Sequence, residues 1–462
     1  MSVAAAHAER LAARNGGRLA LAALVTILLL GLGLRVAEAW DGRSPVYDAA
    51  AYATIAERLA EGDGFTLGAN ATQPASNYSP GLPLLVGGVY ELSGGAHERF
   101  ARLVLALAGT LAMLFTFLIG RCLAGPVAGL IGAAAVAIYP ALLEYQGMLM
   151  GEPLAATLLS GAVLSMLWAG QDPTPHATRA RWLVPGLLLG ALVLVRPEYL
   201  GISVLLAMVM LAWGRNEWRV GLANAGVLLA GVAVVVAPWT GRNAVVLDRF
   251  VPVSTGGGQV LFAGNYMPSG GDPERVGEEV LERHPRLTRQ LAAEHPPRGS
   301  LPMKYSGKEP HPLLGRVRLE QILAALAAQR YPNLPSDEAL GRMGRERLWN
   351  DLTGRPLGYA GFVAAKVWRA WSRGPRDVME EPAWRALHLA LVALALAGLA
   401  VLVRRRPDAT LLIAVLLVAV TAIVALLVAS PRRVLVTLPL IAALAGVGAT
   451  ALADSLARRW QP

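Results

Sequence analysis

Long apolar runs without any Asp, Glu, Lys or Arg constrain this chain more than any other feature of its sequence. A helix that crosses a membrane needs about 20 mostly apolar residues, because hydrocarbon offers no partner to backbone amides. Two shorter runs accompany the long ones, and all are consistent with an all-α polytopic membrane protein with about ten transmembrane helices. The runs cover residues 19–34, 103–120, 122–143, 153–171, 182–195, 199–214, 220–241, 386–403, 409–431 and 434–453.

The composition supports this class and excludes others. Hydrophobic residues make up 55% of the chain and charged residues only 16%, against roughly 25% charged in a soluble domain. A single cysteine rules out an intramolecular disulfide framework and a cysteine-rich metal site. The formal net charge is +10, but the arginines lie between long apolar runs rather than on one continuous patch, so nucleic-acid binding is disfavoured.

Arginine placement predicts the topology. Arg10, Arg14 and Arg18 precede the first run and could form the basic region of a secretory signal, but no convincing cleavage site follows. We therefore expect a retained first helix. Lys and Arg favour cytosolic loops, and this bias places both termini in the cytosol.

The domain organisation follows from this topology. We expect a cytosolic basic tail (1–18), an N-terminal transmembrane module (19–237) containing a first outer loop (35–102), an extracytoplasmic domain (238–382), C-terminal transmembrane helices (383–453) and a cytosolic tail (454–462). In the extracytoplasmic domain the patterns predict short strands at 247–261, helices at 315–330 and 336–352, and an interfacial helix at 359–371. This domain would thus be mixed in structure.

The first outer loop carries a candidate catalytic acid. Asp48, Tyr52, Ala56 and Leu59 are three or four residues apart, so they share one face of a short helix that Gly62 or Gly64 ends. A partly desolvated carboxylate on that face could accept a proton from a hydroxyl or amine. The alternative is that Asp48 only caps the helix N-terminus.

Further polar positions flank the apolar runs. Tyr78-Ser-Pro-Gly is a rigid turn that enters an apolar segment, and Tyr139-Pro140 ends the third run. Glu152 begins the fourth, where a carboxylate also interacts favourably with the helix dipole.

Arg196, Arg432 and Arg433 lie on the outer side in this topology, and Arg242 lies at the outer end of the seventh run. They could extend to lipid headgroups. Alternatively they could bind a phosphate, to which the planar, permanently charged guanidinium is well suited.

Other signals are weak or absent. His284, His295 and His311 each precede a proline, but their irregular spacing without a completing ligand disfavours a metal site. The sequence contains no Walker motif and no Gly-x-Ser-x-Gly elbow, which disfavours ATP-driven chemistry and an elbow-type hydrolase. Gly446-Val-Gly448 lies within the last run and indicates helix packing.

The order of these motifs resembles the GT-C superfamily of integral-membrane glycosyltransferases, in particular the bacterial branch similar to protein O-mannosyltransferases and the lipid A aminoarabinose transferase. The matching segments extend over most of the chain, except about residues 268–336. They are Asp48-x-x-x-Tyr52, Gly62-x-Gly64-Phe65, Tyr78-Ser-Pro-Gly-Leu-Pro, Tyr139-Pro140, Glu152-Pro153, Leu194-Val-Arg196-Pro197-Glu198, Pro238-Trp-Thr-Gly-Arg242-Asn243, Phe250-Val-Pro-Val-Ser254 and Pro431-Arg432-Arg433.

The resemblance implies a GT-C-like fold and an inverting glycosyltransferase in a bacterial inner membrane. Its sugar donor would be a polyprenyl phosphate, and its acceptor a lipid, a glycan or a protein on the extracytoplasmic face. Asp48 would be the catalytic base and Glu152 a second acid. Tyr52 and Tyr78 would bind substrate, and Arg196, Arg242, Arg432 and Arg433 would bind the donor phosphate. No cofactor is implied, although some members of the superfamily use a divalent ion.

Two departures from the family pattern and two other function classes stay open. Ala49 follows Asp48 where many relatives have a second acid, and Val434 follows Arg433 where an aromatic residue is usual. A transporter or flippase of a lipid-linked sugar would share the spans and the outer arginines, but no inverted repeat is evident. A non-catalytic scaffold would need neither Asp48 nor the arginines. The sequence names neither the sugar nor the acceptor.

Overall fold

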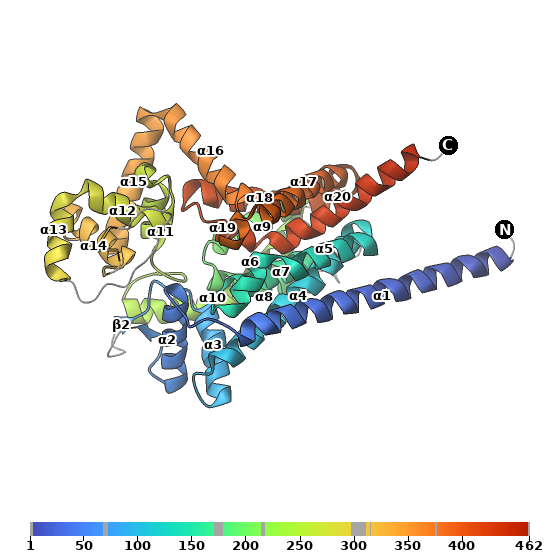
Figure 1. The fold of residues 1–462 in the computed structure, drawn as a ribbon, viewed down its shortest axis with the longest axis horizontal. Coiled ribbons are helices and arrows are strands. Elements are labelled where there is room, and N and C mark those ends of the chain that lie inside the picture. Colours follow the sequence, from blue (N-terminus) through green and yellow to red (C-terminus); the bar gives the residue numbers. More distant parts are fainter. Residues whose placement is uncertain are drawn as a thin grey trace. The chain divides into compact units, whose positions relative to one another are not determined.

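The computed structural model describes residues 3–67, 73–170, 179–213, 218–296, 311–314, 316–374 and 377–460, and in them the protein is an all-α polytopic membrane protein (Figure 1). Seven helices are long and apolar enough to cross a membrane. They are α1 (Val3–Trp40), α4 (Glu98–Ala124), α7 (Glu152–Ala169), α10 (Trp218–Leu247), α17 (Pro382–Arg405), α18 (Pro407–Leu426) and α20 (Leu438–Arg459).

The remaining expected runs are a bent pair and two shorter helices. Helix α5 (Pro126–Ile138) passes the apolarity test together with the segment Pro140–Gly147, to which it is bent by 54°. That segment contains α6 (Pro140–Glu144) and η1 (Tyr145–Gly147). Helices α8 (Leu183–Val195) and α9 (Tyr199–Trp213) are apolar but short, and they meet at Arg196 as predicted. Each apolar run of the sequence therefore corresponds to a helix or a bent pair.

The chain forms two compact units. The first comprises Met1–Val253, Gly374–Val418 and Val434–Pro462, and the second comprises Ser254–Arg373 and Ala419–Arg433. The boundary expected at Pro238 falls inside α10, which continues to Leu247. Proline is tolerated there because membrane helices re-satisfy the freed backbone group locally.

Small residues bring the helices of the first unit together. A methyl group at Gly448 of α20 would collide with the carbonyl oxygen of Leu394 in α17, and one at Gly398 with that of Leu444. Close backbone approach at small residues is the usual packing mode of membrane helices, which confirms the packing role predicted for Gly448. Helix α20 also contacts α5 and α4, and Figure 1 shows these helices side by side.

The first outer loop folds into two helices and a small ribbon. Helix α2 (Asp48–Glu61) ends at Gly62, which adopts the left-handed conformation (φ 86°) and donates its N–H to carbonyls of the last turn, as the sequence predicted. Strand β1 (Thr66–Leu67) pairs antiparallel with β2 (Gln73–Pro74), with Thr66 opposite Pro74. Helix α3 (Gly81–Ser93) then follows the Ser-Pro-Gly turn and packs on α2.

The second unit is helical in the described residues. Its helices surround one buried core, which includes Phe262, Tyr266, Leu287, Leu323 and Leu340. The elements are α11 (Gly257–Gly264), η3 (Met267–Ser269), α12 (Pro273–Arg283), α13 (Pro285–Glu294), α14 (Leu319–Arg330), α15 (Ser336–Gly354) and α16 (Pro356–Ser372), and α19 (Pro431–Leu435) begins there. Short 3-10 turns η2 (Arg179–Trp182) and η4 (Asp377–Glu380) belong to the first unit.

Helices α14, α15 and α16 confirm the periodicities of the sequence, but the strands predicted at 247–261 are wrong. Side chains of α10 occupy the backbone carbonyls that a partner strand would need. Asn243 Nδ2 donates to Val251 O (3.1 Å) and Val253 O (2.9 Å), and Trp239 Nε1 donates to Val253 O (2.8 Å). The glycines that follow begin α11 instead of a turn between strands.

A buried lysine of the second unit caps the C-terminal ends of two helices. Lys366 is 0% exposed, and its Nζ donates to Gly264 O (2.7 Å) and Ala425 O (2.9 Å). Both carbonyls lie in the last turns of their helices, α11 and α18, where partial negative charge accumulates. Burial, with the nearby Arg433 and Arg369, lowers the pKa of Lys366 to about 7.

Candidate active site

Asp48 occupies the first turn of α2, directly after a strained residue. The N-cap position belongs to Tyr47, so Asp48 is not the cap, and its half-buried carboxylate lies at the positive end of the helix dipole. Tyr47 has φ 52° and ψ −122°, a conformation that side-chain-bearing residues rarely adopt. Such strain costs about 1–3 kcal/mol and is concentrated at functional sites.

Two tyrosines join α2 to the loop before α3. The rings of Tyr52 and Tyr78 lie 5.5 Å apart in an edge-to-face arrangement at 79°. Tyr52 packs against a buried cluster of α2, α3, α4 and the segment before α7, which includes Leu82 and Leu149. Tyr78 packs against a second cluster, which includes Phe65. The two residues predicted to bind substrate are therefore in contact with each other.

Glu152 and Arg196 form an ion pair that the sequence did not predict. Arg196 Nη2 donates to Glu152 Oε1 at 2.5 Å, and the carboxylate side chain is 0% exposed against 19% for the guanidinium. Glu152 is the first residue of α7, and Arg196 lies at the break between α8 and α9. The structure thus brings a predicted acid and a predicted phosphate-binding residue together.

Close backbone contacts hold this ion pair at the meeting point of three helix ends. A methyl group at Gly81, the first residue of α3, would lie 2.9 Å from Leu194 C, and one at Gly151 would lie 3.1 Å from Val195 Cγ1. The start of α3, the start of α7 and the end of α8 therefore converge. Two of the three are helix N-termini, which favour negative charge.

Arg242 lies on an aromatic platform beside the first outer loop. Its Cζ is 4.9 Å from the Trp239 ring centroid and 5.7 Å from that of Phe65. Nη1 donates to Asn243 Oδ1 (3.0 Å) and Nη2 reaches Phe65 O (3.4 Å). Among the described residues no carboxylate pairs with Arg242, so its charge is available to an anionic ligand.

Phe65 and Trp239 are contributors that sequence reasoning did not single out. Their rings lie 4.8 Å apart, and Phe65 belongs to the same cluster as Tyr78. Both residues lie within the segments quoted for the family resemblance, Gly62-x-Gly64-Phe65 and Pro238-Trp239, which was the available signal. Tyr52, Tyr78, Phe65, Trp239 and Arg242 therefore form one continuous set of contacts.

Arg432 and Arg433 belong to the second unit, whereas the other candidate residues belong to the first. Both are half-buried in the short helix α19. Arg433 Nη1 donates to Val428 O at 3.0 Å, which fixes it to the segment that follows α18.

The described part of the chain contains no group of three His, Cys, Asp or Glu side chains placed to hold a metal ion. The sequence disfavoured a metal site at His284, His295 and His311. Of these three histidines, His284 lines a cavity of the second unit.

No model of a known protein family matches this sequence, and neither does any curated protein. Among solved structures, the chain is similar to the archaeal oligosaccharyltransferase AglB from Archaeoglobus fulgidus in complex with an inhibitory peptide and a dolichol-phosphate. The TM-score is 0.56 and the identity 17%, with 95% of this chain and 51% of the other covered. The apo form of the Archaeoglobus fulgidus oligosaccharyltransferase gives a TM-score of 0.56 at 16% identity and the same coverage.

ArnT from Cupriavidus metallidurans bound to undecaprenyl phosphate also matches, at 18% identity and a TM-score of 0.41, with 97% of this chain and 81% of ArnT covered. This chain spans about half the length of the archaeal enzymes. At such identities the likeness to the archaeal enzymes concerns the fold, and it covers 95% of this chain. The chain therefore shares its fold with the archaeal oligosaccharyltransferase, as the resemblance found in the sequence predicted.

Proposed function

We propose that this protein is an inverting glycosyltransferase that moves a sugar from a polyprenyl-phosphate donor to an acceptor on the extracytoplasmic face of a bacterial inner membrane. The observation that carries the proposal is the fold, shared over 95% of the chain with an oligosaccharyltransferase whose structure contains a dolichol-phosphate. Candidate residues lie on several helices of this fold, as a site for a lipid-linked donor and a separate acceptor requires.

Asp48 acts as the general base in this proposal. Its carboxylate takes the proton of the acceptor hydroxyl or amine while the acceptor atom attacks the anomeric carbon. The bond between that carbon and the phosphate oxygen breaks, and the polyprenyl phosphate leaves with the bonding electrons. Attack from the face opposite the phosphate inverts the sugar. The half-buried position of Asp48 beside Tyr52 supports this role.

Arginines stabilise the leaving phosphate. Arg242 is the best placed of the first unit, because aromatic rings fix its guanidinium and no carboxylate of the described residues neutralises it. Arg432 and Arg433 stay proposed donor-phosphate residues on the sequence resemblance alone. Arg196 pairs with Glu152, so in this proposal Glu152 acts by orienting the guanidinium of Arg196.

Tyr52 and Tyr78 present ring faces and hydroxyls suited to a sugar. The donor is already activated, so the proposal assigns no cofactor. It leaves the acceptor as a lipid, a glycan or a protein.

Transfer from a labelled donor tests the proposal. Membranes that contain wild type, Asp48→Asn or Glu61→Gln are supplied with a panel of radiolabelled polyprenyl-phosphate sugars. Glu61 is a matched control, since it is an acid of the same helix with a 54% exposed side chain. Label should move from the carrier into an acceptor fraction with wild type and Glu61→Gln, and this transfer should be lost with Asp48→Asn at equal protein insertion.

Two outcomes would contradict the proposal. Transfer that survives Asp48→Asn would exclude Asp48 as the base. Absence of transfer from every donor, with translocation of labelled lipid that does not depend on Asp48, would indicate a transporter.

A further inference from the structure

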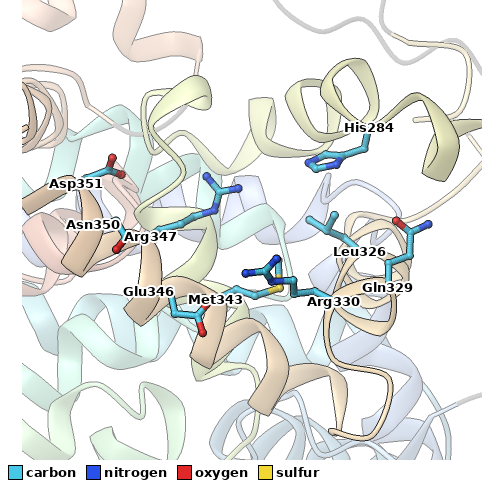
Figure 2. A pocket seen from close by; sticks show the side chains of 9 residues that line it. All are labelled: His284, Leu326, Gln329, Arg330, Met343, Glu346, Arg347, Asn350 and Asp351. Atoms are coloured by element: carbon cyan, nitrogen blue, oxygen red, sulfur yellow. The ribbon is translucent and has the colours of Figure 1, made fainter. Parts of the chain in front are cut away.

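The second unit contains a cavity of about 530 Å³ that is lined mostly by polar and charged residues, and its volume is typical of small-ligand sites. Among the described residues that line it, Leu326 and Met343 are apolar and the others carry amide, imidazole, guanidinium or carboxylate groups. Figure 2 shows Arg347 of α15, Arg330 of α14 and His284, which precedes α13, directed from three elements toward the same space.

Arg347 is the unusual member of this lining. Its Cζ lies 4.7 Å from the Tyr266 ring centroid and 5.3 Å from that of Phe262, and both rings are core residues with at most 1% exposure. The guanidinium is therefore held on a rigid platform. It makes no hydrogen bond or ion pair with any described residue, although burial lowers its pKa. Five N–H donors in a half-desolvated position call for an acceptor.

The acids of the lining do not supply that acceptor. Glu346 Oε1 accepts from Tyr331 Oη at 2.5 Å and from Arg342 Nε at 3.4 Å, so this carboxylate is already engaged. Asp351 lies near Arg347 without forming an ion pair within 4.0 Å in the described structure.

Arg330 adds a second guanidinium without a hydrogen bond or ion pair to the described residues. His284 adds a ring nitrogen, and its pKa is lowered by burial and by the charge of Arg347. The lining thus holds two guanidinium groups and two carboxylates, of which Glu346 is already engaged by Tyr331 and Arg342.

We infer that this cavity binds an oxyanion, a phosphate or carboxylate carried by a soluble, hydroxylated ligand such as a sugar phosphate. Arg347 supplies the planar fork that matches such a group, and Arg330 supplies a second charge. Gln329 and Asn350 supply amide groups for hydroxyls. The inference goes beyond the proposed glycosyl transfer and does not depend on it.

Direct binding to the full-length protein tests the inference independently of transfer. The protein is reconstituted in phosphatidylcholine nanodiscs, and binding of glucose 6-phosphate, inorganic phosphate and glucose is measured by calorimetry at low salt. We expect saturable binding of both phosphates and none of glucose. Arg347→Gln and Arg330→Gln should each weaken phosphate binding about tenfold or more, the usual effect of losing a charged hydrogen bond.

Two further variants make the result specific. Arg347→Lys should bind phosphate little better than Arg347→Gln, because lysine keeps the charge but lacks the planar guanidinium that can donate two parallel hydrogen bonds. Arg275→Gln should bind as wild type, since Arg275 pairs with Glu279 on α12 and does not line the cavity. If Arg347→Gln disturbs the packing of Phe262 and Tyr266, Arg330→Gln still tests the inference, because the side chain of Arg330 is exposed.

The inference is overturned if glucose binds as well as its phosphate, if both arginine variants bind as wild type, or if no probe binds. Weakened binding with unchanged glycosyl transfer would support the cavity as a separate site. Displacement of glucose 6-phosphate by phosphatidylglycerol in the nanodisc would retain the oxyanion site but assign it to a lipid headgroup.

Discussion

At the scale of single residues, the Glu152–Arg196 ion pair has the largest expected effect on stability. Removing one partner of a buried pair leaves an uncompensated charge and costs about 3–5 kcal/mol. Glu152→Gln and Arg196→Gln should therefore each lower the apparent Tm of the purified protein. The double variant should be more stable than the sum of the two losses predicts, because it leaves neither charge unpaired. Additive losses would show that the two side chains are not energetically coupled.

Lys366 should give the protein a specific dependence on pH. Its pKa is about 7 in the folded state against an ordinary value of 10.5, so the unfolded chain binds more protons between these values. Stability should consequently rise with pH across this window, and the contribution is lost as the pH falls toward 7. The Tm of wild type and of Lys366→Met is measured at several pH values from 7 to 10. The Tm of wild type minus that of the variant should increase as the pH rises. Parallel curves would mean that Lys366 is not the responsible group.

The candidate residues were predictable by type but their partnerships were not. The Asp, the arginines and the tyrosines stand out in the sequence because charged and aromatic residues interrupt or flank apolar runs. Arg196 and Glu152 are 44 positions apart, and the platform of Arg242 joins residues 177 positions apart. Such pairings depend on how helices pack, which apolar periodicity does not encode.

At the scale of elements, the start of α11 depends on one glycine. A methyl group at Gly258 would collide with the carbonyl oxygen of Asp337 and lie 2.7 Å from Gly341 N in α15. Gly258→Ala should separate α11 from α15 and destabilise the second unit by about 1–3 kcal/mol. Gly257→Ala is the matched control, because nothing lies within 4 Å of its added methyl group.

Limited proteolysis of the two glycine variants, read at cleavage sites within residues 254–373, measures this effect. Gly258→Ala should be cut faster than wild type and Gly257→Ala at the wild-type rate. Equal protection of both variants would show that the backbone of α15 can move aside at little cost.

Elements with a strong local signal were predicted well. The helix from Asp48 to the left-handed Gly62, the break at Arg196 and the helices α14 to α16 follow from periodicity, glycine and proline. The prediction of strands at 247–261 was wrong. The β-branched residues of this segment favour a sheet, but its backbone carbonyls accept hydrogen bonds from side chains of α10. Tertiary contacts therefore overrode local propensity.

At the scale of the whole molecule, the orientation in the membrane remains a prediction that labelling can check. In a Cys122→Ala background, Ser44→Cys lies in the expected outer loop and Asp454→Cys in the expected cytosolic tail, and both original residues are exposed. A membrane-impermeant maleimide should label Ser44→Cys in cells with a permeable outer membrane. It should label Asp454→Cys only after lysis. The reverse pattern would invert the topology.

The burial of α20 has a consequence for the biogenesis of this protein. Every residue from Leu438 to Gly448 is buried, against helices that include α4, α5 and α17. Among the described transmembrane helices, α20 leaves the ribosome after all the others, so until then the faces of its neighbours that it will cover remain exposed in the membrane. Chains that terminate before Leu438 would lack α20, the helix against which α4, α5 and α17 pack. We expect such chains to be recognised by membrane quality control and degraded, even though the candidate residues of the first unit would already be synthesised.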